Sequence, residues 1–551
     1  MMPYSTPDTT SRIFKASTTI PQPQLTHSHL GLPASSQPCR FNSAMSNPPG
    51  HTSRDGFQWT PETGLKAGVP CLGVIQPQST VKSKDTVYDV AVIGAGYTGL
   101  TAIRDLTTTG HSTLLIEARD RIGGRSWSSN INGYPFEMGG TWVHWTQPFI
   151  WRELFRYNLL DNLEVSMSKA GGINKCAVTM SKDKPTIFMS HEEEDVISES
   201  GLKKLVNVDG ELGRTVIPWP HDALRNKEAV AIYDKMSLKD RIDQIQDELS
   251  PLERNMLEGF LAITCGGKWE DSSFFEMLRW WALANWDYRD FIEMGLTYKL
   301  KCGQSALQRC LFDEAHDTGR LTHSFSTPVA SVHDKGDVVE VTGRDGTVFK
   351  AKRLICTIPL NVLHSIQFTP ALLPLKTQAS VEGHANHVVK CHVEVAKPEL
   401  RSLGAFNYPH GKLTYTFGDG TTPAGNTHLV AFGSSLPGVH LQAEEDIGAT
   451  LEAWKQLLPG AEDKDLKRIV FHNWHNDEFA RGAWEWFKPN QVSRYLEALR
   501  EKQGNVWFGS ADWAMGWRGF LDGGIEDGQR VAKEVADNLK ASRSLRVTTR
   551  L

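Results

Sequence analysis

The chain has 551 residues, of which 40% are hydrophobic and 22% are charged, as is typical of a soluble globular protein with about two to four domains. Its net charge of −5 excludes a general attraction to nucleic acid, and no run of the sequence reaches the ~18 apolar residues that a membrane span needs. The eight cysteines are scattered without a C-x-x-C pair, so the sequence predicts no zinc site and no disulfide framework, and a reducing compartment is the simplest inference.

The two ends of the chain bear on where the protein is found. Residues 1–52 are rich in Ser, Thr, Pro and Gln and nearly free of acidic residues, and the prolines disfavour the amphipathic helix of a transit peptide. We therefore predict a disordered extension, or a segment upstream of a start at Met45. The chain ends in Thr549-Arg550-Leu551, a loose variant of the S-K-L signal, so we expect a peroxisomal address, with a cytoplasmic location as the alternative.

The first regular elements that the sequence predicts form a strand–turn–helix–strand unit. Tyr88–Ile93 is apolar and rich in β-branched residues, as in a buried strand. The next six residues read G-A-G-Y-T-G, and Leu100–Thr109 has a helical pattern. A second apolar strand, Thr113–Ile116, leads directly into Glu117.

The G-x-G-x-x-G turn of this unit predicts dinucleotide binding. Its first glycine makes the tight turn, the second lets the backbone approach a pyrophosphate, and the third allows close packing of helix on strand. The helix N-terminus faces the phosphate charge, and Glu117 stands eighteen residues beyond Gly99, where an acid can bind ribose hydroxyls. A glycine-rich turn also occurs in other α/β proteins, but the complete unit favours the dinucleotide. The residues predicted to bind the cofactor here are Gly94, Ala95, Gly96, Thr98, Gly99 and Glu117.

Two motifs that follow resemble the flavin-dependent amine oxidases, the group that contains the monoamine and polyamine oxidases. They are E-A-R-D-R-I-G-G-R at 117–125 and M-G-G-T-W at 138–142. Arginine forks suit a pyrophosphate, and the glycine pairs let the backbone pass close to an extended cofactor. The resemblance implies that the cofactor is FAD and adds Arg119, Arg125, Gly139, Gly140, Thr141 and Trp142 to its predicted site.

Residues 150–300 are expected to be largely helical and to belong to a substrate domain. Met236–Leu249 and Leu252–Ile263 have helical periodicity, with a break at Ser250-Pro251 between them. Phe274–Trp286 is dense in aromatic residues, which most often form plain core. Some of them, and Trp219, are candidates for the lining of a channel to the flavin.

From Gln304 the chain is expected to return to the cofactor domain, with strands at 328–332, 338–342 and 354–359. The resemblance places Val329 near the adenine and places Lys390 where the family's lysine holds a water against flavin N5. A solvated lysine on an edge strand is the alternative for Lys390, although its apolar sequence neighbours are unusual for an exposed residue.

The last part of the chain matches the family's closing motif. Val506–Asp512 is a predicted strand that ends in a small-residue turn and an acid, and a helix follows that runs to about Leu539. The resemblance directs Asp512 towards ribityl or phosphate-side groups and the backbone N–H of Leu521 towards the flavin pyrimidine edge. A helix N-terminus there stabilises negative charge on the flavin.

Three further residues match the family's flavin site. Ala483 stands where mammalian monoamine oxidases carry the cysteine that bonds to FAD, so non-covalent FAD is expected. Trp484 and Phe520 match the two walls of the family's aromatic cage, and fungal soluble monoamine oxidases share this alanine and this pair. The polar end of the chain lacks the membrane anchor of the mammalian enzymes, and the resemblance covers about residues 53–540. The predicted catalytic residues are Lys390, Trp484 and Phe520.

The expected fold class is α/β, with a Rossmann-like FAD-binding domain interleaved with a mixed-sheet plus helical substrate domain. The predicted FAD-binding parts are 85–163, 304–379 and 477–540. The predicted substrate-domain parts are 164–303 and 380–476, and a polar tail follows at 541–551.

The predicted function is an FAD-dependent monoamine oxidase that converts primary amines to imines and aldehydes and reduces O2 to H2O2. Secondary amines, the preferred amine, its stereochemistry and a homodimer are left open. A polyamine or L-amino acid oxidase on the same frame is one alternative, and a non-catalytic flavin-binding regulator is another. The expected partners are a small-molecule amine and O2, with no nucleic acid and no membrane anchor.

Overall fold

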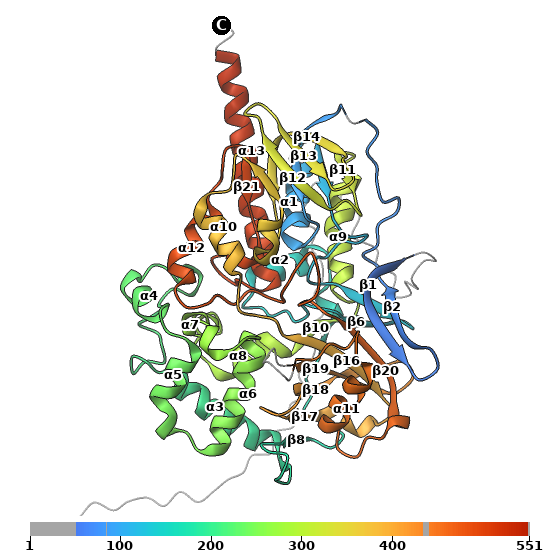
Figure 1. Ribbon diagram of the computed structural model, residues 1–551, viewed down its shortest axis with the longest axis vertical. Helices are drawn as coiled ribbons and strands as arrows, with labels where there is room; N and C mark the ends of the chain where they lie inside the picture. Colours follow the sequence, from blue (N-terminus) through green and yellow to red (C-terminus); the bar gives the residue numbers. More distant parts are fainter. Residues whose placement is uncertain (1–50, 84, 434–439, 549–551) are drawn as a thin grey trace, which may run out of the picture. The chain divides into compact units, whose positions relative to one another are not determined.

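The computed structural model describes residues 51–548, except residue 84 and residues 434–439 (Figure 1). The predicted extension lies outside these residues apart from its last two positions, and so does the C-terminal Thr549-Arg550-Leu551. The described residues belong to one compact unit of the chain.

An eight-stranded sheet contains the predicted strand–turn–helix–strand unit. Along the sheet the order is β11-β4-β3-β14-β13-β12-β15, and β21 also pairs with β14. The strands β11, β4, β3, β14 and β21 run parallel, as is expected of an open α/β sheet with crossover helices. The bounds are β3 Val87–Ile93, β4 Thr113–Ile116, β11 Leu321–Ser324, β12 Val329–Asp334, β13 Val339–Gly343, β14 Val348–Cys356, β15 Gln367–Thr369 and β21 Val506–Phe508.

A second large sheet is nine-stranded and mixed, in the order β2-β1-β20-β16-β19-β18-β17-β8-β9. Its first two strands come from residues 52–70, of which 53–70 were assigned to no domain and Thr52 was counted with the predicted extension. Their pattern of buried and exposed positions is irregular, with Gly56 at a positive φ of 78°, so alternation did not reveal them. The bounds are β1 Thr52–Thr60, β2 Gly64–Pro70, β8 Lys175–Val178, β9 Ile187–Met189, β16 Val389–Val395, β17 Leu403–Phe406, β18 Leu413–Thr421, β19 Thr427–Gly433 and β20 Leu466–His472.

The predicted helical segment, which follows β9 in the sequence, is present and has well-defined ends. The expected break at Ser250-Pro251 is an N-cap: the Ser250 side chain accepts a hydrogen bond from the backbone of Glu253, and Pro251 takes the first helical position. Gly266 closes the same helix in the left-handed conformation. The helices of this segment are α3 His191–Val206, α4 Lys227–Tyr233, α5 Leu238–Ile245, α6 Pro251–Cys265, α7 Phe274–Leu283 and α8 Tyr288–Leu296 (Figure 1).

The remaining helices cover the sheets, and one of them differs from its prediction. Helix α1 (Tyr97–Thr108) packs against α9 (Gln304–Asp317) and against α13. Helix α13 spans Leu521–Thr548 and so runs nine residues beyond the predicted end at Leu539. The others are α2 Pro148–Arg156, α10 Pro374–Glu382, α11 Ile447–Leu457 and α12 Gln491–Arg500. In the described part of the chain, no helix combines the length and the apolar character that a membrane crossing requires.

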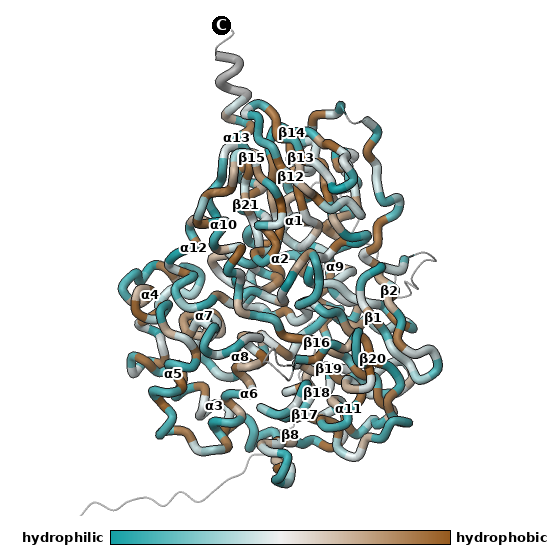
Figure 2. The backbone as a smooth tube through the Cα atoms, viewed as in Figure 1, coloured by the Kyte–Doolittle hydropathy of each residue, from teal (hydrophilic) through white to brown (hydrophobic). Residues whose placement is uncertain are grey.

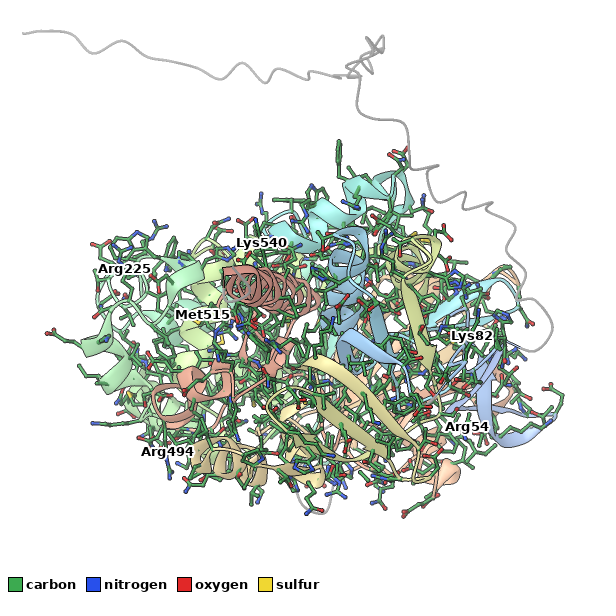
Figure 3. The ribbon with its side chains drawn as sticks, turned by 90° about the horizontal axis from the view of Figure 1, so that it is seen from above. Arg54, Lys82, Arg225, Arg494, Met515 and Lys540 are labelled. Carbon is green, nitrogen blue, oxygen red and sulfur yellow. The ribbon has the colours of Figure 1, made fainter. Side chains whose placement is uncertain are left out.

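Apolar and charged residues lie in different parts of this fold. Apolar segments concentrate in the strands of the two sheets (Figure 2). Charged side chains such as Arg54 and Arg494 extend outwards from the ribbon, with side chains 71% and 52% exposed (Figure 3). A charged group that is fully buried in this protein is therefore an exception that needs a partner.

Candidate active site

A cavity extends from the glycine turn after β3 to the side chains of α6, α7 and α8. It brings together residues that are far apart in the sequence. All the predicted site residues line it except Gly99 and Asp512. Those that line it are Gly94, Ala95, Gly96, Thr98, Glu117, Arg119, Arg125, Gly139, Gly140, Thr141, Trp142, Val329, Lys390, Ala483, Trp484, Phe520 and Leu521.

The three glycines of the turn face different surroundings. Gly94 has a φ of 103°, and a Cβ added there would lie 2.4 Å from the Thr357 hydroxyl. A Cβ at Gly99 would lie 1.9 Å from the carbonyl oxygen of Gly94, so Gly99 serves the close packing of helix on strand and does not face the cavity. A Cβ at Gly96 would meet no atom within 4 Å and would project into open space.

The Glu117 carboxylate is held by two backbone N–H groups. It accepts hydrogen bonds from Ala95 N at 2.6 Å and Arg119 N at 2.8 Å. Burial raises its pKa, against the influence of Arg119. Each oxygen keeps a further lone pair, so Glu117 can still accept a hydrogen bond from a hydroxyl group of a bound ligand.

Arg119, predicted to be a fork for the pyrophosphate, directs part of its guanidinium at two acids of the protein. Although Arg119 lines the cavity, its guanidinium donates to both oxygens of Asp477, at 2.9 and 2.6 Å, and to Asp55 at 2.9 Å. These carboxylates outweigh burial and raise the pKa of Arg119. These three hydrogen bonds to two acids hold Arg119 in the wall of the cavity.

Asp512, predicted to face the cofactor directly, lies behind the cavity wall. It is fully buried, it does not line the cavity, and its carboxylate accepts from Arg125 and from Leu360 N at 2.9 Å. Arg125 donates in addition to the carbonyl of Ala483 at 2.8 Å. Asp512 thus orients a cavity arginine and contacts no cavity space itself.

Lys390 is buried, contrary to the alternative of a solvated edge-strand lysine. Strand β16 lies between β20 and β19, and Lys390 is 4% exposed. Its Nζ donates to the carbonyl of Gly139 at 2.9 Å and to Thr141 Oγ1 at 2.5 Å, and it lies 4.7 Å from the Trp142 ring centroid. Burial lowers the pKa of this ammonium group.

A polar network lies next to this lysine. Trp142 Nε1 donates to Ser166, which donates to Asp419, and Lys299 Nζ donates to the other Asp419 oxygen at 2.9 Å. His392, Asp419 and His428 are spaced as metal ligands can be. The Lys299 ammonium already neutralises Asp419, so a second cation at this place would be repelled.

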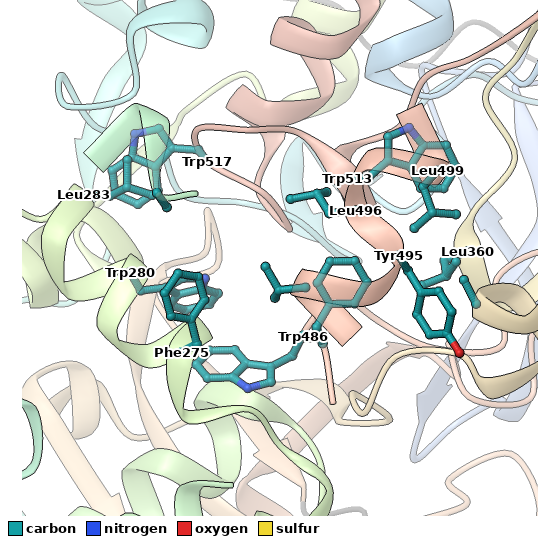
Figure 4. Close-up of a cluster of buried hydrophobic side chains, with 14 of the residues drawn as sticks. Phe275, Trp280, Leu283, Leu360, Trp486, Tyr495, Leu496, Leu499, Trp513 and Trp517 are labelled. Atoms are coloured by element: carbon teal, nitrogen blue, oxygen red, sulfur yellow. The ribbon is translucent and has the colours of Figure 1, made fainter. Parts of the chain in front are cut away.

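The two predicted cage residues line the cavity from separate segments. Trp484 donates its indole N–H to the carbonyl of Thr264 at 3.0 Å, and its ring lies edge-on to Phe432 with centroids 6.4 Å apart. Phe520 packs on Trp280, with centroids 4.5 Å apart. Trp280 continues into the buried aromatic cluster through Trp486, at 5.0 Å (Figure 4).

The aromatic residues of the helical segment divide between core and cavity. Trp280 lines the cavity, whereas Trp281 is fully buried and lies outside the lining. Trp219 is 50% exposed, has the Arg225 guanidinium over its ring and does not line the cavity. Only the tertiary structure separates them, because all three are tryptophans in one helical region.

The helical end of the cavity is apolar, and sequence reasoning did not identify most of it. A hydrophobic residue in a cavity wall has the same sequence pattern as one in the core, so no signal distinguished them. The residues are Phe260, Ile263, Thr264, Trp280, Phe291, Ile292, Met294, Leu296, Val388 and Phe432.

The charged residues of the wall, apart from Lys390 beside Phe432, lie elsewhere. Glu117 and Arg119 belong to the glycine-turn end, and Arg344 and Glu478, which pair with each other, join them there through Phe479. The others are Arg125 and the buried Lys390. Among the residues that the structure describes, the helical end therefore carries no carboxylate and no guanidinium.

Comparison with known proteins relates this arrangement to a family. A family model described as flavin containing amine oxidoreductase matches residues 97–536. The chain is 30% identical over 459 residues to pseudooxynicotine dehydrogenase from a Pseudomonas species, a match that covers 83% of this chain and 88% of that protein. It is 27% identical over 470 residues to the flavin-containing amine oxidase of Oncorhynchus mykiss, with 81% and 85% covered.

Two solved structures share the fold. Putrescine oxidase bound to putrescine superposes with a TM-score of 0.67 at 21% identity, covering 82% of this chain and 99% of that one. Cyclohexylamine oxidase from Brevibacterium oxydans gives a TM-score of 0.65 at 18% identity, covering 83% and 100%. These similarities confirm the predicted α/β fold.

Proposed function

Because the chain belongs to the family of flavin containing amine oxidoreductases, we propose that it is an FAD-dependent monoamine oxidase. Membership makes it a flavin enzyme that acts on amines. The proposal adds that the substrates are primary amines with an apolar substituent, and that O2 is reduced to H2O2. The imine product would hydrolyse to an aldehyde.

The cavity fits FAD at its glycine-turn end. The space beside Gly96, which a Cβ would enter, suits the close approach of a pyrophosphate to the backbone. Glu117 would bind ribose hydroxyls, the N-terminus of α1 would face phosphate charge, and Val329 would contact the adenine. When bound, FAD supplies the acceptor for the two electrons that the amine loses.

The apolar helical end is the observation that carries the proposal. An amine held there would have its substituent among aromatic and aliphatic side chains, with its nitrogen between Trp484 and Phe520. The ring faces attract an ammonium group, but only the neutral amine can release hydride, so these residues bind and orient it for reaction. The buried ammonium group of Lys390 supplies hydrogen-bond donors to the same cavity.

The alternatives on the same frame require charges that this end lacks. An L-amino acid oxidase needs a cation for the substrate carboxylate, and a polyamine oxidase tends to need acids for the second ammonium. The described wall offers no carboxylate at the helical end, and Lys390, which pairs with Phe432 there, already donates to Gly139 and Thr141. A regulator without turnover would need no aromatic pair beside a buried lysine, so catalysis is favoured.

A panel of matched amines tests this function. Phenethylamine and L-phenylalanine differ only in a carboxylate, and pentylamine and 1,5-diaminopentane differ in a second amino group. We expect the first of each pair to be oxidised with release of H2O2. The second should have a kcat/KM lower by at least about 100-fold, because a charge would be buried without a partner.

The panel also separates the alternatives. Equal or faster turnover of L-phenylalanine or 1,5-diaminopentane would contradict a monoamine oxidase. The relative named for pseudooxynicotine adds that compound to the panel, and because that relative is named a dehydrogenase, an artificial electron acceptor should be compared with O2. Turnover with the acceptor alone would refute the oxidase part of the proposal.

We propose a peroxisomal address on the basis of Thr549-Arg550-Leu551. An enzyme that releases H2O2 would suit that compartment. Deletion of these three residues from a fluorescent fusion should redistribute it from peroxisomes to the cytoplasm. An unchanged distribution would contradict the signal.

A further inference from the structure

Four charged side chains are buried behind the aromatic walls of the cavity. Glu276 and Arg279 lie on α7, Glu485 follows Trp484, and Arg518 precedes the N-terminus of α13. Each of the four is at most 1% exposed, and none lines the cavity. We call them the buried charge cluster.

Glu276 joins the two arginines of the buried charge cluster. Its Oε2 accepts from Arg279 Nε at 2.9 Å, and its Oε1 accepts from Arg518. Arg518 Nε lies 3.4 Å from a carboxylate oxygen of Glu485. One carboxylate on α7 thus holds a guanidinium on its own helix and another from the segment before α13.

The same groups fix the backbone around them. Arg279 donates to the carbonyl of Gly516 at 2.9 Å and to that of Arg518 at 3.1 Å. Gly519 has a φ of 83°, and a Cβ there would lie 2.8 Å from the carbonyl oxygen of Glu485. Segment 516–519 is therefore pressed against both α7 and the segment that follows Trp484.

Each segment that the cluster joins carries one aromatic ring of the cavity wall. Trp280 follows Arg279 directly, Trp484 precedes Glu485, and Phe520 is the second residue after Arg518. The buried charge cluster therefore contacts all three segments that carry these rings.

The energetics argue against stability as the main role of this cluster. Burying ions costs free energy, and apolar residues of similar volume often stabilise a core as well or better. Within the part of the chain that the structure describes, neither oxygen of Glu485 accepts a hydrogen bond, and burial raises its pKa. The charged groups instead fix geometry. Hydrogen bonds between a carboxylate and two guanidinium groups set the relative positions of their segments, which apolar contacts would leave free.

We propose that Glu276 is a positioning residue that sets the spacing of Trp280, Phe520 and Trp484, and thereby the preference of the cavity for flat aromatic amines. The inference about preference rests on the proposed function. Glu276 touches neither the cavity nor a substrate, so it acts through Arg279 and Arg518.

The test is the Glu276→Gln holoenzyme, in which size is kept and the negative charge is lost. The ratio of kcat/KM for phenethylamine to kcat/KM for pentylamine should fall at least about tenfold, with FAD still bound, because aromatic walls that are held less firmly discriminate less between shapes. A crystal structure of the variant should show the Trp280 and Phe520 centroids displaced from their 4.5 Å separation. The crystal structure is independent of any substrate.

Glu153→Gln is the matched control. Glu153 is also fully buried and also bridges two arginines, Arg104 and Arg152, but it lies on α2 and outside the cavity wall. The Glu153→Gln variant should be less stable, but its ratio of the two kcat/KM values should change by no more than about twofold. Arg279→Lys, which keeps the positive charge but loses the planar guanidinium, is the second variant in case Glu276→Gln does not fold. It should also lower the ratio of the two kcat/KM values.

The outcomes separate the two proposals. A wild-type ratio and unchanged ring spacing in both cluster variants would overturn the positioning role, and so would an equal fall of the ratio in Glu153→Gln. If the wild-type enzyme oxidises neither amine, the proposed function fails, while the ring spacing in the crystal structure still decides the role of Glu276.

Discussion

Gly96 is the residue at which an added side chain should most affect the cofactor. Gly96→Val should purify without visible flavin absorbance, because the side chain would enter the open space beside the turn. Gly448→Ala on α11 is the control, since its new Cβ would lie 3.4 Å from Asp446 Oδ1, an ordinary contact, and flavin content should stay at the wild-type level. Full flavin in Gly96→Val would contradict the predicted binding mode.

Ala483 is the residue on which the predicted non-covalent attachment of the flavin rests. It lines the cavity, and no cysteine does so among the described residues. Acid precipitation of the protein should therefore release all of the FAD into the supernatant, as measured by its absorbance. Flavin that stays with the precipitated chain would show that another residue forms a covalent link.

The catalytic role predicted for Lys390 can be tested by measuring the two half-reactions separately. Lys390→Met should keep FAD bound but slow the reaction of reduced enzyme with O2 by roughly 10²–10³, because a nearby cation stabilises the charge formed as oxygen accepts its first electron. Lys239→Met, with a side chain 44% exposed, is the control. Stopped-flow measurement of the two half-reactions would contradict the role if both run at the wild-type rate.

At the scale of elements, the network beside Lys390 joins two strands. Lys299 lies on β10 (Tyr298–Leu300) and Asp419 on β18, and each is at most 2% exposed. Asp419→Asn should cost about 3–5 kcal/mol, because it leaves a buried ammonium without its main partner. The thermal unfolding temperature should fall by several degrees, whereas Asp463→Asn, at a 79% exposed side chain, should leave it unchanged. Equal stability of the two variants would contradict this assignment.

The elements around the cofactor could be predicted from the sequence because their signals are local. The glycine turn, β3, β4 and the N-cap at Ser250 each depend on residues that are neighbours in the chain. The sequence could not assign β1 and β2, whose alternation is irregular.

Partners across the fold could not be predicted. The residue types that bind a pyrophosphate are also those that form ion pairs, so the sequence could not show that Arg119 faces Asp477 or that Asp512 faces Arg125. The apolar wall from α6 and α8 was missed because core and cavity residues follow the same periodicity.

At the scale of the whole molecule, two titrations should shape the pH dependence. The reductive half-reaction should accelerate from acid to mildly alkaline pH, since only the neutral amine reacts. The oxidative half-reaction should slow as the pH rises through the pKa of Lys390, which burial lowers from 10.5, because the cation is lost there. Rates of the two half-reactions that do not change with pH, with chemistry limiting, would contradict both assignments.

The most direct test of the account is anaerobic mixing of the purified holoenzyme with phenethylamine while flavin absorbance is recorded. We predict that the visible band bleaches, and that admission of O2 restores it with one H2O2 released for each amine oxidised. A flavin that stays oxidised with every amine of the panel would contradict the central claim that this cavity oxidises amines.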